Sequence, residues 1–525
     1  MAPPSVARRA TVALAVLGSF YVTTATLALA LLPLPVLAVM YMRPVRVFML
    51  LLIAAGCWIT AYGLITGLLG VRPPRFEEPG VRLGRGDAPS LFAMIEELAQ
   101  RAGIAPPHDV YVSAMPDLFV TETGGGFLGG KSRRVLCVGA PYLAVFSVSE
   151  LRAVLAHELG HYVGGDTKLT GVLAYTEGAF RSVLASTERN ALREGTTHWA
   201  IDVGGWIASV VGEGLVKVFA RVYLGLTRPM SRRQELAADA LSAALAGRDA
   251  AIRALEQAHV MGPLYEVYLA NEVKPAIDDG VMPTDLLDGF ARCNAALARY
   301  GRVAELSRAV QEDRTDPFDT HPALVDRVAA LSTLPAGSPP IVDARAVTLL
   351  DGAFQLDRWL VDATLSSVVR ADQPPVARMT WAEAHASVLP ARVHERARET
   401  AARLFASMPG ARTMTEMLAA VIAAYDAGKT YDVVAGLEPE LHAAPPHVRA
   451  QIVPKLAGVV VLSLFEGALL ERGAVLEDSL GEPSRVFRFG DETVRAGLIA
   501  IDAMNSDVAR GELLRLSAKL AHASA

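Results

Sequence analysis

The sequence predicts a mainly α-helical protein with a small β-sheet, an N-terminal transmembrane helical hairpin and a helical C-terminal domain. Two long uncharged stretches begin the chain, short strand-like runs follow, and helical patterns dominate after residue 147. Hydrophobic residues make up 52% of the sequence and charged residues only 20%, which is more apolar than an ordinary cytosolic protein. We therefore expect part of the chain to contact lipid.

Size and charge limit the classes of function. The 525 residues exceed the roughly 250 to 300 at which single cores stop growing, so we expect two globular parts besides the membrane segment. A net charge of -5 provides no basic face for a phosphate backbone, so nucleic acid is not an expected partner. Three distant cysteines without a CxxC pair argue against a disulfide framework or a cysteine metal site. His, Asp and Glu remain as candidate metal ligands.

Residues 1–72 are predicted to form a membrane anchor with two transmembrane helices, at about 10–42 and 47–71. Both stretches lack charges and exceed the roughly 20 residues that a helix needs to cross the hydrocarbon core. A cleaved signal peptide is the alternative, but its apolar core runs only about 7 to 15 residues. The stretch 199–226 contains charges at four positions, which favours an amphipathic or buried helix over a third span.

Arginines predict how the anchor is oriented. Arg8 and Arg9 precede the first span and four arginines follow the second, whereas two lie in the turn. By the positive-inside rule both ends of the hairpin are cytoplasmic. We therefore expect a multi-pass protein of the cell membrane, with everything after residue 72, including any catalytic domain there, in the cytoplasm.

The elements after the anchor predict two domains. A helix is expected at 90–103 and strands at 109–113, 118–121 and 134–138. The sequence Ser147-Val148-Ser149-Glu150 predicts a capping box that opens a helix through VLAHELGHYV. We predict one domain over 73–333, a proline-rich linker at 334–341 and a second, mostly helical domain over 342–525. The second domain carries no recognisable chemistry.

Two histidines one helical turn apart predict a metal site. His157 and His161 stand at i and i+4 in HELGH, so both imidazoles can bind one ion at about 2.0 to 2.1 Å. Glu158 can take a proton from water bound to that ion, because zinc lowers the pKa of such water to near 7. HExxH arises by chance in roughly one such chain in a hundred, and the alternative is a helix with two ordinary histidines.

Acidic residues downstream can complete this site. A catalytic zinc takes a third protein ligand, which Glu235 can provide. Asp239, one turn later, can accept a hydrogen bond from the other ring nitrogen of a ligating histidine. A solvated acidic pair beside two arginines is the alternative. Further on, His321, fixed by Asp319, could donate to the oxyanion of a tetrahedral intermediate, although alone it would be a loop histidine before a proline.

Three motifs in this order resemble those of the HtpX and CAAX prenyl protease family of membrane zinc endopeptidases, over roughly residues 72–333. They are HELGH followed by Asp166, E-x-x-A-D at 235–239, and T-H-P with Arg327 six residues after the histidine. The resemblance implies a zincin-like metallopeptidase domain that hydrolyses peptide bonds of membrane, misfolded or prenylated proteins. A polypeptide substrate and the lipid bilayer are therefore the expected partners.

The resemblance also implies roles for individual residues. One zinc ion per chain would be held by His157, His161 and Glu235, with Glu158 as the catalytic base. His321 would assist the transition state. Supporting roles around the ligands are implied for Asp239, Asp166, Asp319 and Arg327.

The strand before the active helix and the membrane segment differ from the family pattern. Asp117-Leu118-Phe119 stands where the family commonly shows an Asn-Ala-Phe-like stretch. These three residues are the candidate substrate-binding positions, since an extended substrate would pair with this edge strand by β-augmentation. Relatives often carry additional spans between the two zinc motifs, which the sequence does not show convincingly.

Two other readings of the sequence compete with a peptidase. GGFLGGKS at 125–132 fits the pattern of a phosphate-binding loop, but such a loop opens a helix. Here Lys131 leads into a strand-like run, so we expect a hairpin turn and no nucleotide. The other reading is a membrane adaptor whose zinc-stabilised domain presents the C-terminal region to a protein partner. A structural zinc is closed by four ligands and would have no use for Glu158, which favours the peptidase.

Overall fold

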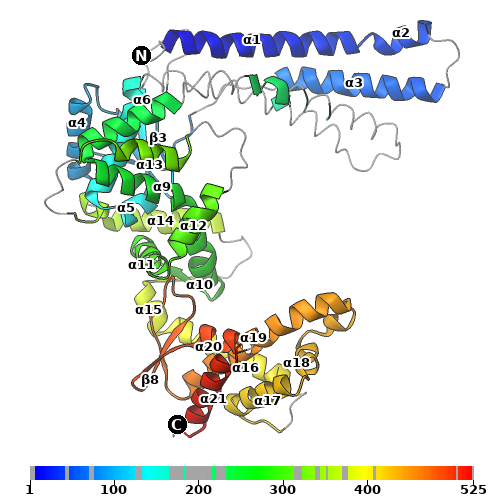
Figure 1. Ribbon diagram of the computed structural model, residues 1–525, viewed down its shortest axis with the longest axis vertical. Coiled ribbons are helices and arrows are strands. Elements are labelled where there is room, and N and C mark those ends of the chain that lie inside the picture. Colours follow the sequence, from blue (N-terminus) through cyan, green and yellow to red (C-terminus); the bar gives the residue numbers. More distant parts are fainter. Residues whose placement is uncertain are drawn as a thin grey trace. The chain divides into compact units, whose positions relative to one another are not determined.

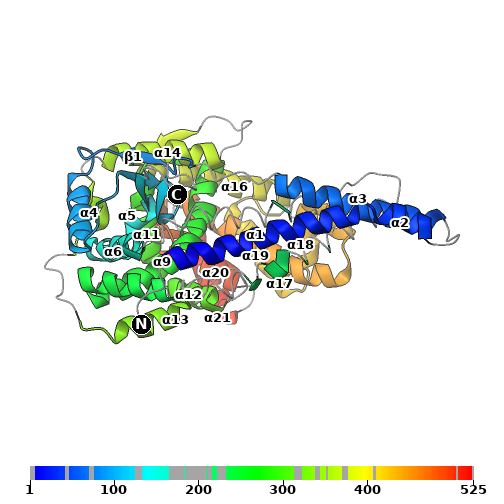
Figure 2. The same ribbon diagram turned by 90° about the horizontal axis from the view of Figure 1, so that it is seen from above.

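The protein is mainly helical with small sheets, as predicted (Figures 1 and 2). The computed structural model describes residues 6–41, 47–69, 76–123, 133–164, 182–183, 210, 214, 216–219, 221–222, 232–312, 322–336, 343–350, 353–368, 376–405, 410–503 and 506–522. The chain divides into two compact units. The first comprises Met1–His259 with Ser307–Asp351, and the second comprises Val260–Leu306 with Gly352–Ala525.

The N-terminal hairpin contains three helices, α1 (Val6–Leu31), α2 (Leu34–Tyr41) and α3 (Val47–Leu69). The first predicted span is therefore interrupted, because Pro33 has no backbone N–H to continue a helix. Residues Leu14–Leu37 are long and apolar enough to cross a membrane. The second predicted span coincides with α3, whose 23 residues carry no charge and which packs along α1.

Only part of the stretch 199–226 lies among the described residues. The described positions 216–219 are helical, and the Phe219 ring packs edge-on against Phe20 of α1 with centroids 5.3 Å apart. Ser182 donates a hydrogen bond to the carbonyl oxygen of Gly67 at 2.8 Å. Described residues between the two metal-site motifs thus contact both long helices of the hairpin.

A four-stranded sheet supports the predicted metal-site helix. Its order is β1 (Val81–Leu83), β2 (Asp109–Ser113), β4 (Arg133–Gly139) and β3 (Leu118–Thr123), with β2 and β4 parallel and both outer pairs antiparallel. The three predicted strands are present, and β1 is an addition. The glycine-rich segment between β3 and β4 lies outside the described residues. β1 and β3 are the edge strands of this sheet. The helices α4 (Pro89–Arg101) and α5 (Ala140–Val145) belong to the same part of the chain.

The predicted capping box opens α6 (Val148–Gly164). The Ser147 amide donates to Glu150 Oε2 at 2.9 Å, and the Glu150 amide donates to Ser147 Oγ at 3.3 Å. Asp343, from the segment before the short helix η2 (Ala346–Leu349), accepts bonds from the amide and hydroxyl of Ser149. The start of the metal-site helix is therefore held both locally and by residues nearly two hundred positions later.

Further helices follow in both units. A helix over residues 232–246 precedes α9 (Arg248–Tyr268), and α13 (Leu324–Ser332) returns to the first unit. The second unit begins within α9, at Val260, and continues through η1 (Leu269–Val273), α10 (Lys274–Asp278), β5 (Val281–Pro283) and α11 (Leu286–Arg299) to the first turns of α12 (Arg302–Glu312).

The C-terminal part of the second unit is mostly helical. Its elements are α14 (Ala353–Val368), β6 (Ala377–Met379), α15 (Trp381–Ala386), α16 (Val388–Phe405), α17 (Met414–Asp426), α18 (Thr430–Leu437), η3 (Pro439–His442), α19 (Pro446–Glu471), β7 (Val475–Leu476), β8 (Val486–Phe489), β9 (Glu492–Arg495), α20 (Ala496–Asp502) and α21 (Asp507–His522). The helix α19 is also apolar enough to span a membrane, but 61% of its apolar window is buried, and it packs on α16, α17, α18 and α20. It is the core helix of this unit.

The second unit is built from two segments that are distant in the sequence. Residues Val260–Leu306 belong with the C-terminal part, because β5 pairs with β6 and the Trp381 indole donates to the Tyr268 hydroxyl at 3.0 Å. Gly289 allows this packing, since a Cβ there would lie 2.3 Å from the indole nitrogen. Long-range packing of this kind leaves no signal in local sequence composition.

Glu272 is expected to give the second unit a pH-dependent stability. Burial raises the pKa of Glu272 to about 7. The hydrogen bond from the Gly481 amide and the charge of Arg485 lower this pKa but do not offset the effect of burial. Cys293 is another titratable group close to this carboxylate. The folded state then binds a proton more tightly than the unfolded state between pH about 4.5 and 7. Stability should therefore fall as pH rises through that window.

Glu272→Gln keeps an acceptor for Gly481 and removes the charge. Its unfolding temperature should equal that of the wild type near pH 4 and exceed it at pH 8. The gain in unfolding free energy at pH 8 should be about 3 kcal/mol. Thermal unfolding in detergent from pH 4 to pH 8 measures the difference in unfolding temperature between the two proteins. A difference that does not change with pH would contradict the raised pKa of Glu272.

Candidate metal centre

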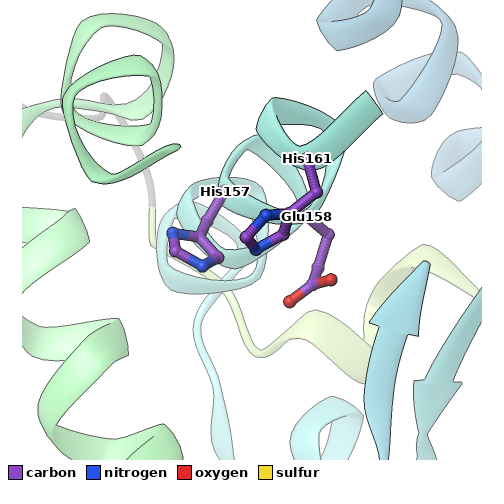
Figure 3. Close-up of side chains that lie close together, drawn as sticks. All are labelled: His157, Glu158 and His161. Carbon is purple, nitrogen blue, oxygen red and sulfur yellow. The ribbon is translucent and has the colours of Figure 1, made fainter. Parts of the chain in front are cut away.

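The HELGH segment presents its three functional side chains on one side of α6. His157, Glu158 and His161 offer ligand atoms that all lie within 4.8 Å of one another. The two imidazole rings meet edge to face, with centroids 5.0 Å apart. Figure 3 shows both rings and the Glu158 carboxylate projecting to the same side of the helix. The i, i+4 spacing thus brings the histidines together as predicted.

Glu235 completes a set of three ligand atoms from the helix over residues 232–246. It is buried, with Oε2 3.6 Å from His157 Nε2 and Oε1 3.9 Å from His161 Nε2. These distances are too long for hydrogen bonds. Ligands bonded at 2.0 to 2.2 Å to a tetrahedral zinc ion lie roughly 3.3 to 3.6 Å apart. The separation between His157 and Glu235 falls in this range and that between His161 and Glu235 is slightly longer, so the three residues would hold one ion after a small side-chain adjustment.

A close helix crossing sets these distances. A Cβ added at Gly160 would lie 2.9 Å from the Cα of Ala238 and 3.0 Å from its Cβ. One turn further along the same crossing, the buried Ser242 hydroxyl donates to the Ala153 carbonyl at 2.6 Å. Small residues on both helices therefore allow Glu235 to reach the two histidines.

Asp239 and Arg327 hold the first histidine in place. Asp239 Oδ1 lies 2.9 Å from His157 Nδ1, so this nitrogen donates to the carboxylate, and the ring presents Nε2 toward Glu235. Arg327 donates to both Asp239 oxygens, at 2.8 and 2.7 Å, and its Nη1 lies 3.3 Å from Glu235 Oε2. Burial opposes ionisation of Asp239, but Arg327 and His157 outweigh it and lower the pKa of Asp239.

The metal-site helix is also bonded to the edge of the sheet. The Tyr162 hydroxyl donates to the carbonyl oxygens of Val135 at 2.7 Å and Thr121 at 3.1 Å. These two residues face each other in the β3–β4 pair. The position of β3 relative to the histidines is therefore fixed through a single hydroxyl group.

A cavity of about 370 Å³ opens beside the metal centre. Of the candidate substrate-binding residues, Leu118 and Phe119 line it. The Asp117 carboxylate instead accepts a bond from the Ser113 hydroxyl at 3.0 Å. The remaining lining comes from Tyr142, Ala153, Val154, His157, Glu158, His161, Glu235, Asp239, Ser242, Ala251, Ala254, Leu255, Ala258 and Arg327.

The sequence and the structure overlap only in part at this site. Asp166, Asp319 and His321 lie outside the described residues. Sequence reasoning missed the contributions of Gly160, Ser242, Tyr162 and the α9 residues. The glycine and the small residues of the second helix were visible inside the motifs, but only the crossing shows what they do.

Two histidines and a glutamate on one helix thus lie beside a buried glutamate from a second helix and a buried Asp–Arg pair, an arrangement suited to binding a metal ion. The model of peptidase family M48 matches residues 87–334. The predicted resemblance is thereby confirmed: these residues match the model of peptidase family M48 and are similar to HtpX proteases. The match ends before residues 335–525.

Curated relatives agree with this assignment. The protease HtpX homolog of Sulfurihydrogenibium sp. (strain YO3AOP1) is 28% identical over 239 residues, 43% of this chain and 76% of that protein. Protease HtpX of Hahella chejuensis (strain KCTC 2396) is 27% identical over 249 residues, 46% and 71% of the two chains. The homolog from Persephonella marina (strain DSM 14350 / EX-H1) is 31% identical over 196 residues, 36% and 63%.

Among solved structures, the crystal structure of S. mikatae Ste24p matches 53% of this chain and 58% of that chain at 18% identity. Its TM-score of 0.27 is too low to support an inference about the fold.

Gly160→Ala should push the two ligand-bearing helices apart. The new methyl group has no room against Ala238, so Glu235 should move away from the histidines, and we expect zinc affinity to fall by about tenfold or more. Competition with a chromophoric chelator measures the affinity. The control is Gly262→Ala, at a helical position where nothing lies within 4 Å of the new atom. Equal zinc affinity in both variants would contradict the role of the crossing.

Asp239→Asn should weaken metal binding by another route. The amide cannot replace the charged partner of both His157 and Arg327, and loss of such a partner typically costs 10- to 100-fold in metal affinity. The same competition assay applies, with the exposed Asp249→Asn as the control. If both variants bind zinc as tightly as the wild type, Asp239 does not support the ligand.

Proposed function

We propose that this protein is a membrane-anchored zinc endopeptidase that hydrolyses peptide bonds of membrane-associated or misfolded proteins. The observation that carries the proposal is the convergence of His157, His161 and Glu235, with Glu158 beside them, on one cavity. The match of residues 87–334 to the model of peptidase family M48 supports it.

The residues of this chain take separate roles in the proposed reaction. When bound by His157, His161 and Glu235, zinc would supply the Lewis acidity that activates water and polarises the scissile carbonyl group. Glu158 lines the cavity and takes a proton from the attacking water, then returns it to the leaving amine. Asp239 keeps the His157 ring oriented through the reaction.

The family resemblance supplies the remaining catalytic role. His321, oriented by Asp319, would donate a hydrogen bond to the developing oxyanion. Arg327, six residues later, lies in the metal centre, which supports placing this part of the chain beside the cavity. Asp166 would support the ligands, as the resemblance implies.

An extended polypeptide substrate would pair with β3. This strand lies at the edge of its sheet, and Leu118 and Phe119 line the cavity. Main-chain hydrogen bonds to β3 would hold a peptide bond of the substrate beside the metal centre, whatever the substrate's sequence. Such binding suits unfolded segments, which expose their backbone groups.

The membrane hairpin would keep the site near its substrates. The candidate span Leu14–Leu37 and the uncharged α3 support two crossings. The arginines flanking the hairpin favour a cytoplasmic catalytic domain. Substrates would then be proteins at or in the inner face of the membrane.

Glu158→Gln tests the proposed reaction. With the base removed, cleavage of an unfolded protein by zinc-loaded protein in detergent should fall by about 10²- to 10⁴-fold, because general base catalysis contributes that much. Gel analysis follows the cleavage, and zinc content should be unchanged because Glu158 is not a ligand. Cleavage at the wild-type rate would contradict the proposal, and a zinc-bound wild type without any cleavage would favour the adaptor.

A further inference from the structure

One wall of the cavity is not used by the proposed chemistry. Helix α9 contributes Ala251, Ala254, Leu255 and Ala258, which we call the α9 wall. Their spacing of i, i+3, i+4 and i+7 places them on one face of the helix. Three of the four are alanines, so the helix leaves space beside the metal centre that larger side chains would fill.

The α9 wall offers no charge to a substrate side chain. Among the described lining residues, every charged group belongs to the metal centre, where Arg327 and Asp239 neutralise each other. The hydroxyl group of Ser242, also in the described lining, already donates to the Ala153 carbonyl. A charged side chain lying against the α9 wall would lose its hydration without gaining a partner from that wall, whereas an apolar side chain would gain from leaving water.

The α9 wall is fixed relative to the metal-site helix. Arg253, on the same helix, donates to Glu150 Oε1 at 3.0 Å. The other oxygen of Glu150 accepts the amide of Ser147 in the capping box of α6. One carboxylate therefore links the two helices that border the cavity.

We propose that the α9 wall forms an apolar subsite that selects a large aliphatic or aromatic side chain beside the scissile bond. This inference rests on the proposed peptidase function and adds a substrate class to it: polypeptides whose cleavage positions carry large apolar residues. Such residues are exposed by unfolded proteins and by segments that leave the membrane. The volume of about 370 Å³ is at the lower end of the range for ligand pockets and suits one side chain with its flanking backbone.

Opposite changes in the wall should shift specificity in opposite directions. Ala254→Leu narrows the subsite, and kcat/KM for peptides with a large apolar residue should fall by about 10- to 200-fold while peptides with alanine there are spared. Leu255→Ala widens it and should favour the largest aromatic side chains. Cleavage sites are mapped by mass spectrometry on an unfolded protein, and rates are then measured on matched peptides.

Two further variants protect the test against folding defects. Ala254 is buried, so Ala258→Leu, at a half-buried position of the same wall, provides a second narrowing variant. Glu256→Leu adds the same side chain at an exposed position of α9 and should leave specificity unchanged. A folding defect would lower all rates together and could not shift preference in both directions.

A binding measurement separates specificity from turnover. In the Glu158→Gln background, fluorescence anisotropy of labelled peptides should show at least tenfold weaker binding of a leucine or phenylalanine peptide when Ala254→Leu is added. Unchanged preference in all wall variants, or a wild-type preference for charged residues, would overturn the inference while leaving Glu158-dependent cleavage intact. Absence of any Glu158-dependent cleavage by the wild type would instead overturn the proposed function, and the subsite with it.

Discussion

The close crossing of α6 with the helix over residues 232–246 is the constraint on which the metal centre depends. Gly160 leaves no room for a side chain against Ala238, and Glu235 lies one turn before that contact. The two histidines project from the other helix of the pair. A wider crossing would separate the three ligands, so packing between two backbones fixes a geometry that no single residue could impose.

Buried charge follows from that crossing. Glu235 and Asp239 lie out of water, and leaving either carboxylate alone there would be costly. Arg327 contacts both, and His157 shares Asp239. A bound cation would complete the balance, because it adds positive charge where Glu235 faces the histidines. The network thus orients the ligands and compensates their charge with the same atoms.

Local signals in the sequence were sufficient for β2, β3 and β4, the capping box and the convergence of His157 and His161. Each rests on spacing within a few residues, as in Ser147 and Glu150. Features created by distant contacts were not predictable. Three features depend on packing between elements that are far apart in the chain. They are the bond from Ser149 to Asp343, the packing of residues 260–306 with the C-terminal part, and the α9 wall. Pro33 is visible in the sequence, but the length of the uncharged stretch around it favoured the prediction of one continuous span.

The central claim is that two imidazoles and one carboxylate from two helices hold a single zinc ion. X-ray absorption at the zinc edge of purified, zinc-loaded protein tests it most directly. The account predicts one zinc per chain with nitrogen and oxygen neighbours at about 2.0 to 2.2 Å, two of them imidazoles, and no sulfur. A sulfur neighbour at about 2.3 Å, or an unchanged spectrum in Glu235→Ala protein, would contradict it.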